Sequence, residues 1–206
     1  MLVIKHLQDG LAMKLIGSKK SRAFRTLWML EELGLEYDHD PSPPHAPSVL
    51  EVNPSGKIPA LVVEGSVVTD STAILTYLAD AQGLFTQPAG SIGRARQDAV
   101  TGTILDEVEG ALWTASKHSY VLPKDKCASE VVETAKWEFA RSIARMEDVL
   151  DGPFLMGEEI SVPDFIFVHC LGWAKLAGFP EPGEKVDAYF HHARARDGYK
   201  RAAALP

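Results

Sequence analysis

A turn, two short strands and the start of a helix are predicted within one stretch of the sequence, residues 53–71, NPSGKIPALVVEGSVVTDS. The stretch opens with turn-forming residues and continues into an apolar run, Ile58–Val63, which predicts a β-strand. Pro59 has no N–H for a strand ladder, so we expect it at the entry of that strand. The following Glu-Gly pair predicts a tight turn into a second strand at residues 66–69, which gives an antiparallel hairpin.

The end of this stretch predicts a helix start with binding chemistry. Asp70 and Ser71 are typical helix-capping residues, and apolar residues recur behind them at helical spacing. Free N–H groups at a helix N-terminus and the Ser71 hydroxyl can hold a carboxylate, while Asp70 can hold an ammonium group. At the strand entry, the backbone N–H and C=O of Ile58 are free to pair with an extended peptide. The stretch therefore predicts a site for an amino-acid-like ligand, although a hairpin followed by a capped helix explains the same residues without one.

The segment before this stretch predicts a β-α-β unit. Its expected elements are a strand at residues 12–16, a helix that ends at Gly34, a weak strand at residues 35–38 and a short helix over residues 48–52. Four prolines in residues 41–47 predict an irregular loop before that short helix. Followed by the hairpin and its helix, this order resembles a thioredoxin-like α/β domain over residues 11–82.

The remainder of the chain predicts a helical domain. Residues 83–91 contain two glycines and a proline that break a continuing helix, so we expect a linker there. Residues 92–206 show no convincing strand pattern. The expected helices span about residues 93–120, 129–150 and 165–179, the last of them almost wholly apolar. Ser161 and Asp164 predict a capping box at the start of that buried helix, with a role in folding.

Composition and charge exclude several classes of protein. The chain has 206 residues and a net charge of −7 without a dense basic block, which disfavours nucleic-acid binding. Cys127 and Cys170 lie far apart, so neither a disulfide framework nor a dithiol motif is expected. No apolar run is long enough to span a membrane, and polar residues near the N-terminus disfavour a signal peptide. We expect a cytoplasmic protein without membrane partners, and residues 1–10 are assigned no role.

Three motifs carry a resemblance to a known family. The GKIPAL run, the Asp-Ser pair at the helix start and the SVPD capping box together resemble cytosolic glutathione S-transferases over nearly the whole chain. The resemblance implies an α/β thioredoxin-like glutathione-binding domain at residues 11–82 and a linker at residues 83–91. It implies an all-α helical bundle at residues 92–206 that carries the electrophile pocket. A homodimeric detoxifying transferase with glutathione as co-substrate is the implied activity.

The resemblance also implies roles for five residues of the first domain. Pro59 would be cis, and Ile58 would pair its backbone with the cysteine of glutathione. Asp70 and Ser71 would bind the γ-glutamyl group, and Lys57 would reach the glycine carboxylate. Without the resemblance, Lys57 is explained equally well as an exposed lysine in a turn.

A serine after the first strand is the implied catalytic residue. Glutathione attacks electrophiles as a thiolate, whose charge an enzyme must stabilise near neutral pH. The run Ser18-Lys19-Lys20-Ser21-Arg22 resembles the SxPSR run of serine-type, theta-like bacterial transferases, in which the first serine donates its hydroxyl to the thiolate. The resemblance implies this role for Ser18, with the basic residues adding positive potential. Because Lys20 stands where proline is common, Ser21 is an alternative, and plain helix capping by both serines is another.

The second substrate and the rival functions depend on weaker patterns. Trp113, Ser116 and Tyr120 fall on one stripe of the long helix, where they either line the pocket for a hydrophobic electrophile or pack as ordinary helix residues. No metal-binding spacing or phosphate-binding loop is present in the sequence, so no metal is expected. A non-catalytic glutathione- or ligand-binding regulatory protein on the same fold is the alternative function. Glutathione-dependent disulfide exchange would call for a cysteine in place of Ser18.

Overall fold

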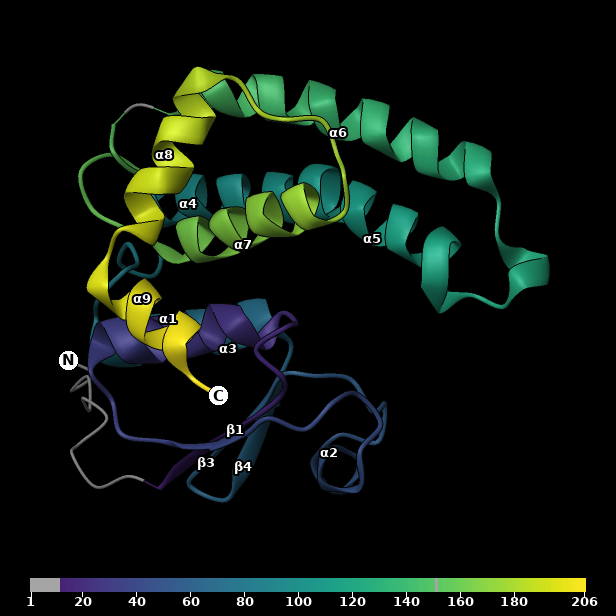
Figure 1. The fold of residues 1–206 in the computed structure, drawn as a ribbon. Helices are drawn as coiled ribbons and strands as arrows, with labels where there is room; N and C mark the ends of the chain where they lie inside the picture. The colour runs from purple at the N-terminus through teal and green to yellow at the C-terminus, as the bar shows by residue number, and fades with distance from the viewer. Residues whose placement is uncertain (1–11, 151) are drawn as a thin grey trace. The chain divides into compact units, whose positions relative to one another are not determined.

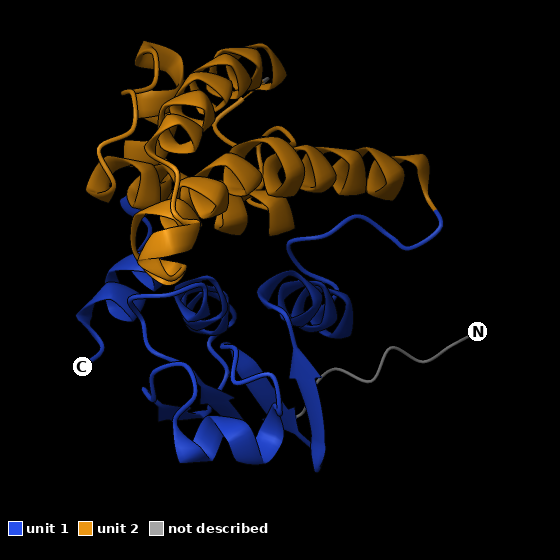
Figure 2. Ribbon diagram, turned by 90° about the vertical axis from the view of Figure 1, so that its right-hand side faces the viewer, with its two compact units in different colours: residues 1–90, 194–206 blue, residues 91–193 orange. Residues whose placement is uncertain are grey.

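The computed structural model of the chain describes residues 12–150 and 152–206, so residues 1–10 lie outside the described part. The described residues divide into two compact units (Figure 2). The first unit contains the residues up to Gly90 together with Arg194–Pro206, and the second contains Ser91–Ala193. Each unit has its own buried core.

A four-stranded mixed sheet forms the centre of the first unit (Figure 1). Its strands are β1 (Met13–Ile16), β2 (Asp38–Asp40), β3 (Ala60–Val63) and β4 (Ser66–Thr69). Their order is β2-β1-β3-β4, with β1 parallel to β2 and antiparallel to β3, and with β3 antiparallel to β4. Leu15 and Leu61, which are partners on the central strands, are fully buried. The predicted thioredoxin-like fold and hairpin are confirmed.

The second strand lies further along the chain than the apolar pattern predicts. The expected strand covers residues 35–38, whereas β2 begins at Asp38, which pairs with Lys14 of β1. The reason is that backbone pairing with β1 defines this strand, since its sequence, Asp-His-Asp, contains no apolar side chain.

Helices α1 and α3 pack side by side on one face of the sheet (Figure 1). The helices of this unit are α1 (Ala23–Leu33), α2 (Pro47–Val52), α3 (Ser71–Gln82) and α9 (Asp197–Ala204). α1 ends where predicted, because Gly34 adopts the left-handed conformation that stops a helix, with φ of 65°. α3 begins directly after Asp70, as the capping pattern predicts.

The last helix packs on α1, although its residues fall in the predicted helical domain of residues 92–206. Tyr199 of α9 meets the rings of Phe24 and Trp28 edge to face, with centroid distances of 5.1 Å to each. The Arg196 guanidinium forms an ion pair of 2.8 Å with Glu32, which is largely buried. Contacts between residues so far apart in the sequence produce no local sequence pattern. Only the folded chain therefore shows that residues 194–206 belong to the first unit.

The second unit contains helices and no strand in its described residues, as predicted, apart from an isolated bridge between Phe154 and Gly157. Its helices are α4 (Ile92–Thr103), α5 (Gly110–Ser116), α6 (Ser129–Val149), α7 (Val162–Leu176) and α8 (Glu184–Arg194), the last of which ends at the boundary of the unit. The predicted helix over residues 93–120 is continuous but contains π-helical turns at Ile104–Glu109 and Lys117–Val121. No helix in the described ranges combines the length and apolar character needed to cross a membrane.

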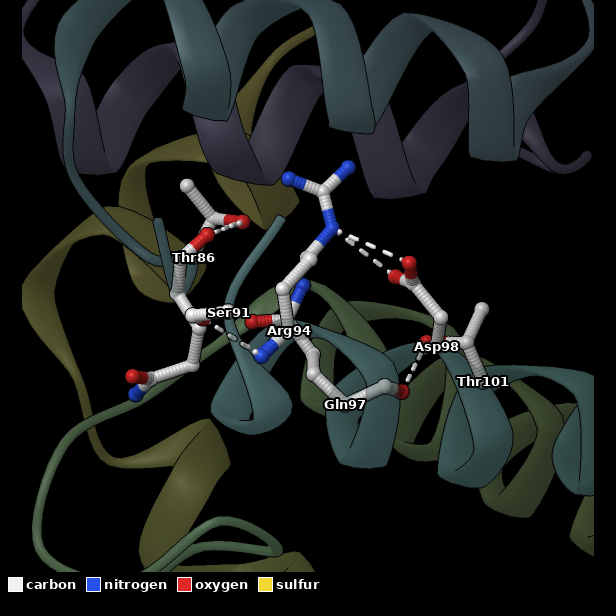
Figure 3. A network of polar contacts seen from close by, with 7 residues as sticks. Thr86, Ser91, Arg94, Gln97, Asp98 and Thr101 are labelled. Atoms are coloured by element: carbon white, nitrogen blue, oxygen red, sulfur yellow. Dashed lines mark hydrogen bonds and ion pairs between the residues drawn. The ribbon is translucent and has the colours of Figure 1, made fainter. Parts of the chain in front are cut away.

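Polar contacts define the start of α4 (Figure 3). The Ser91 side-chain oxygen accepts a hydrogen bond of 3.0 Å from the Arg94 N–H and so caps the helix. One turn later, the Arg94 side chain donates to the Asp98 carboxylate at 2.9 Å. The Thr101 hydroxyl, which is buried, donates to the Gln97 carbonyl at 2.9 Å.

A buried carboxylate organises the start of α7. Asp164 is fully buried and accepts hydrogen bonds from the N–H of Leu155 (2.9 Å), the N–H and hydroxyl of Ser161 (2.8 and 2.9 Å) and the hydroxyl of Tyr189 (2.9 Å). Burial raises the pKa of Asp164, and these hydrogen bonds act in the opposite direction. Burial, followed by the Asp164 charge, raises the pKa of Tyr189 well above its ordinary value, which keeps its hydroxyl a neutral donor. The Ser161–Asp164 interaction at this helix start is present as predicted.

Candidate functional site

The turn after β1 and the entry of β3 lie against each other in the first unit. The Ile58–Pro59 bond is cis, as implied for Pro59. Gly17 has a φ of +146°, and a Cβ there would lie 2.9 Å from the Cβ of Ala23 and 3.2 Å from that of Ile58. Only glycine therefore fits between the two segments. Ser18 is the next residue after this close approach.

Two serines occupy this turn, and their hydroxyls make different hydrogen bonds. The Ser21 hydroxyl donates to the Ser18 carbonyl at 2.7 Å and accepts from the Ala23 N–H at 3.1 Å, so it caps α1. The Ser18 side-chain oxygen accepts a longer contact of 3.3 Å from the Lys20 N–H, and within the described chain its proton is donated to no other group. The Ser18 hydroxyl is thus able to donate to a ligand.

The backbone around Ser18 is held by β2 and the residues after it. The Gly17 N–H donates to the Asp40 carbonyl at 2.8 Å, and the Gly17 carbonyl lies 3.0 Å from the His39 ring nitrogen Nε2. The Ser18 N–H donates to the Ser42 carbonyl at 3.1 Å. Ser42 in turn donates its hydroxyl to the Asp40 carboxylate at 2.6 Å, and this hydrogen bond holds the pKa of that carboxyl below its ordinary value. These hydrogen bonds fix the backbone position from which the Ser18 side chain extends.

One of the implied basic residues is directed elsewhere. The Lys19 ammonium donates to the carbonyls of Ala203 and Leu205, at the C-terminal end of α9. A lysine at that position interacts favourably with the helix dipole. Its charge is therefore partly engaged there, whereas Lys20 is exposed.

The turn before the cis bond is stabilised by its own side chains. The Asn53 side-chain oxygen accepts from the Ser55 hydroxyl at 2.8 Å, and its amide donates to the Lys57 carbonyl at 2.8 Å. The His45 N–H donates to the Gly56 carbonyl at 2.8 Å, which joins the proline-rich loop to this turn. Lys57 is exposed, and its ammonium contacts no acidic side chain within residues 12–150 or 152–206. It remains available for an anionic group of a ligand.

The N-terminus of α3 presents an acceptor and a donor in adjacent residues. Asp70 has an unusual backbone conformation, with φ of 71° and ψ of 125°, and its Oδ1 accepts from the N–H groups of Thr72 (2.9 Å) and Ala73 (3.2 Å). Residues held in such conformations often mark functional sites. Ser71 is 2% exposed, and its oxygen accepts from the Arg25 guanidinium at 3.2 Å. The exposed Asp70 carboxylate can meet a cation beside the helix N-terminus.

Sequence reasoning missed the supporting residues of this site. Arg25 is fully buried, although arginine side chains are mostly exposed. The usable signal was that apolar residues surround α1 on more than one face, which indicates burial all round. His39, Asp40 and Ser42 act through contacts with residues distant in sequence, for which the sequence has no local signal.

The three residues implied for the electrophile lie in the second unit. Trp113 is 36% exposed and Tyr120 is 71% exposed, whereas Ser116 is buried. Tyr120 lies in the π-helical turn after α5 rather than in a regular continuation of that helix. Their role as a pocket stays a prediction. No group of three or more potential metal ligands is found among the residues that the structure describes.

Comparisons with known proteins agree with this geometry. Residues 21–81 match the family described as "Glutathione S-transferase, N-terminal domain". Glutathione S-transferase GST-4.5 of Xanthomonas campestris pv. campestris is 29% identical over 156 residues, which cover 73% of this chain and 76% of that protein. The crystal structure of a glutathione transferase from Methylococcus capsulatus str. Bath is 26% identical with a TM-score of 0.77, over 92% of this chain and 96% of that one. Over most of its length the chain is similar to glutathione S-transferases, and residues 21–81 belong to the family of their N-terminal domain.

A further solved transferase shares the complete fold. The theta class glutathione S-transferase from Xanthomonas axonopodis pv. citri, with glutathione bound, has a TM-score of 0.76 at 21% identity, over 95% of this chain and 99% of that one. The resemblance to this family and the two-part fold implied by the sequence motifs are thus confirmed. The chain has the helix start at Asp70 and the cis bond at Pro59 where the family resemblance implies them.

Proposed function

We propose that this protein is a glutathione S-transferase that conjugates the thiolate of glutathione to an electrophilic small molecule. The observation that carries the proposal is the Ser18 hydroxyl, which directly follows Gly17, the residue packed against the Ile58–Pro59 segment, and has a proton available for a ligand. Relatives named as glutathione transferases support the same activity. The Ser18 residue and the theta-class relative favour a serine-type enzyme.

The first unit supplies the groups that glutathione requires. The backbone of Ile58 pairs with the cysteine of the tripeptide, and Asp70 binds the ammonium of its γ-glutamyl group. The Ser71 hydroxyl and the α3 N-terminus bind the adjacent α-carboxylate, because helix N-termini attract anions. The Lys57 ammonium binds the carboxylate of the glycine. Each charged end of glutathione thereby meets a group of opposite charge or a hydrogen-bond donor.

Ser18 acts on the sulfur. Its hydroxyl donates a hydrogen bond to the thiolate, and the nearby N-terminus of α1 adds positive potential, so the thiol loses its proton to solvent more readily. The sulfur then forms a bond to the electrophilic carbon. In a substitution the leaving group departs with its electron pair, and in an addition the electron pair of the acceptor takes a proton.

We assign the hydrophobic electrophile to the second unit, with Trp113, Ser116 and Tyr120 as its contacts. Incubating the full chain with glutathione and a panel of aryl halides, epoxides, isothiocyanates and hydroperoxides tests the activity. We expect glutathione-dependent turnover of at least one class. Glutathione binding by calorimetry without turnover of any class would favour the non-catalytic ligand-binding alternative, and no glutathione binding would overturn both.

We further propose a cytoplasmic homodimer with a role in detoxification. The support is the family resemblance, in which the subunit interface completes the glutathione site. Light scattering coupled to size exclusion at micromolar concentration should give the mass of two chains. A single-chain mass throughout that range would contradict the proposed dimer.

A further inference from the structure

The Arg25 side chain contacts the first residue of α3. It is fully buried in α1, and its Nη1 donates to the Ser71 side-chain oxygen at 3.2 Å. Arginine stays charged in proteins, and burying a charged group costs free energy unless the group is paired and hydrogen-bonded. One N–H group of this buried cation is placed on a hydroxyl of the candidate site.

Hydrogen-bond chemistry gives Arg25 a defined effect on Ser71. A hydroxyl has one proton to donate and two lone pairs to accept with, whereas a guanidinium only donates. The Arg25 N–H occupies a lone pair of Ser71 and cannot take its proton. Serines in helices otherwise tend to donate that proton to a nearby backbone carbonyl. Because Ser71 is only 2% exposed, few orientations let its hydroxyl reach a ligand.

We propose that Arg25 is a positioning residue for the γ-glutamyl end of glutathione. By occupying the acceptor side of Ser71, it fixes that hydroxyl as a donor toward the α-carboxylate. Asp70, directly before it, is an acceptor suited to the neighbouring ammonium. Of these two adjacent residues, Ser71 thereby donates and Asp70 accepts. This pair matches the carboxylate and the ammonium on the α-carbon of the γ-glutamyl group. The inference rests on the proposed function, since it takes glutathione as the ligand.

A double-mutant cycle between Arg25 and Ser71 tests the proposal. Calorimetry on the full chain gives the glutathione dissociation constant of the wild type, Arg25→Met, Ser71→Ala and the double variant. We expect Arg25→Met to weaken binding by on the order of tenfold, and to weaken it by less than about twofold once Ser71 is alanine, because the effect passes through that hydroxyl. Arg25→Lys, which keeps a charge and a shorter donor, should lie between wild type and Arg25→Met.

Two controls separate positioning from folding. Thr26→Val changes the next residue of α1, which is equally buried and whose hydroxyl meets no hydrogen-bond partner in the described chain, and it should change glutathione affinity by less than about twofold. A tripeptide in which 4-aminobutyrate replaces the γ-glutamyl residue lacks the α-carboxylate. Its affinity should be insensitive to Arg25→Met, whereas general loosening of the site would weaken both ligands.

The outcomes distinguish this inference from the proposed function. Wild-type protein that does not bind glutathione would overturn the function and the inference together. If the wild type binds glutathione and Arg25→Met binds it with equal affinity, the inference alone would be overturned. The inference would also be overturned if Arg25→Met weakened glutathione binding equally with and without the Ser71 hydroxyl. It would likewise be overturned if Arg25→Met weakened the binding of both ligands equally. If Arg25→Met fails to fold, Arg25→Lys in the same cycle decides the question.

Discussion

Replacing Asp164 with alanine is expected to lower the free energy of unfolding by about 3–5 kcal/mol. The substitution removes the acceptor for two backbone N–H groups and two hydroxyls at the start of α7, all inside the protein. Each buried donor left without a partner costs about 1–3 kcal/mol, and relaxation recovers part of that sum. The lost hydrogen bonds destabilise the first turn of α7, which is the most apolar helix of the second unit.

Thermal and urea unfolding of matched variants measure this effect. For a chain of this length, about 3–5 kcal/mol corresponds to a fall in Tm of roughly 6–20 °C. Tyr189→Phe removes a single donor and should cost about 1 kcal/mol, while Asp164→Asn keeps one acceptor oxygen and should lie between the two. A loss below about 1 kcal/mol in Asp164→Ala would show that the network does not stabilise the helix.

Replacing Asp70 with alanine is expected to weaken glutathione binding by about tenfold to a hundredfold. A charge-assisted hydrogen bond is worth roughly 1.5–3 kcal/mol, and each 1.4 kcal/mol is a factor of ten in affinity. The same carboxylate also caps α3, so alanine should lower stability by about 1 kcal/mol. Calorimetry with glutathione and thermal unfolding measure the two effects separately.

Two controls separate the charge of Asp70 from its cap. Asp70→Asn keeps a capping oxygen and tolerates the positive φ of this position, so it should retain stability but lose affinity. Ser91→Ala removes the cap of α4 in the second unit and should lower stability without changing affinity. Unchanged affinity in both Asp70 variants would mean that the ammonium of glutathione binds elsewhere.

The sequence predicts the parts of the fold that local chemistry determines. The hairpin, the helix start at Asp70 and the end of α1 at Gly34 each depend on residues within a few positions of one another, and all three are present. The start of α7 is predicted for the same reason, because Ser161 and Asp164 lie within one turn.

The sequence does not predict contacts between distant segments. β2 forms through pairing with β1, and α9 belongs with α1 because Tyr199 meets two of its aromatic rings. The support of the candidate site is missed for the same reason: Arg25 reaches Ser71 across 46 positions. Ser18 and Ser21 cannot be separated by sequence, since both follow a strand and precede a helix. Their hydrogen bonds separate them, because only Ser21 uses its hydroxyl to cap α1.

The expected size of the Ser18 effect determines which experiment is informative. Lowering a thiol pKa from about 8.5 to about 6.5 raises the thiolate fraction at pH 7 from about 3% to about 75%. The accompanying fall in nucleophilicity takes back roughly eightfold, so the net gain in rate is only about threefold. A larger loss in Ser18→Ala would come from misplacing the sulfur relative to the electrophile. Rate at one pH is therefore a poor test of the role of this hydroxyl.

The pH–rate profile of conjugation, measured for the wild type, Ser18→Ala and Ser21→Ala, tests the proposed activation of glutathione most directly. Binding should be nearly intact in Ser18→Ala, because the anchors at Ile58, Asp70 and Ser71 remain. The apparent pKa of the bound thiol should rise by about one to two pH units in Ser18→Ala and stay unchanged in Ser21→Ala. A rise in Ser21→Ala alone would assign the role to Ser21, and an unchanged pKa in both variants would contradict thiolate stabilisation by this turn.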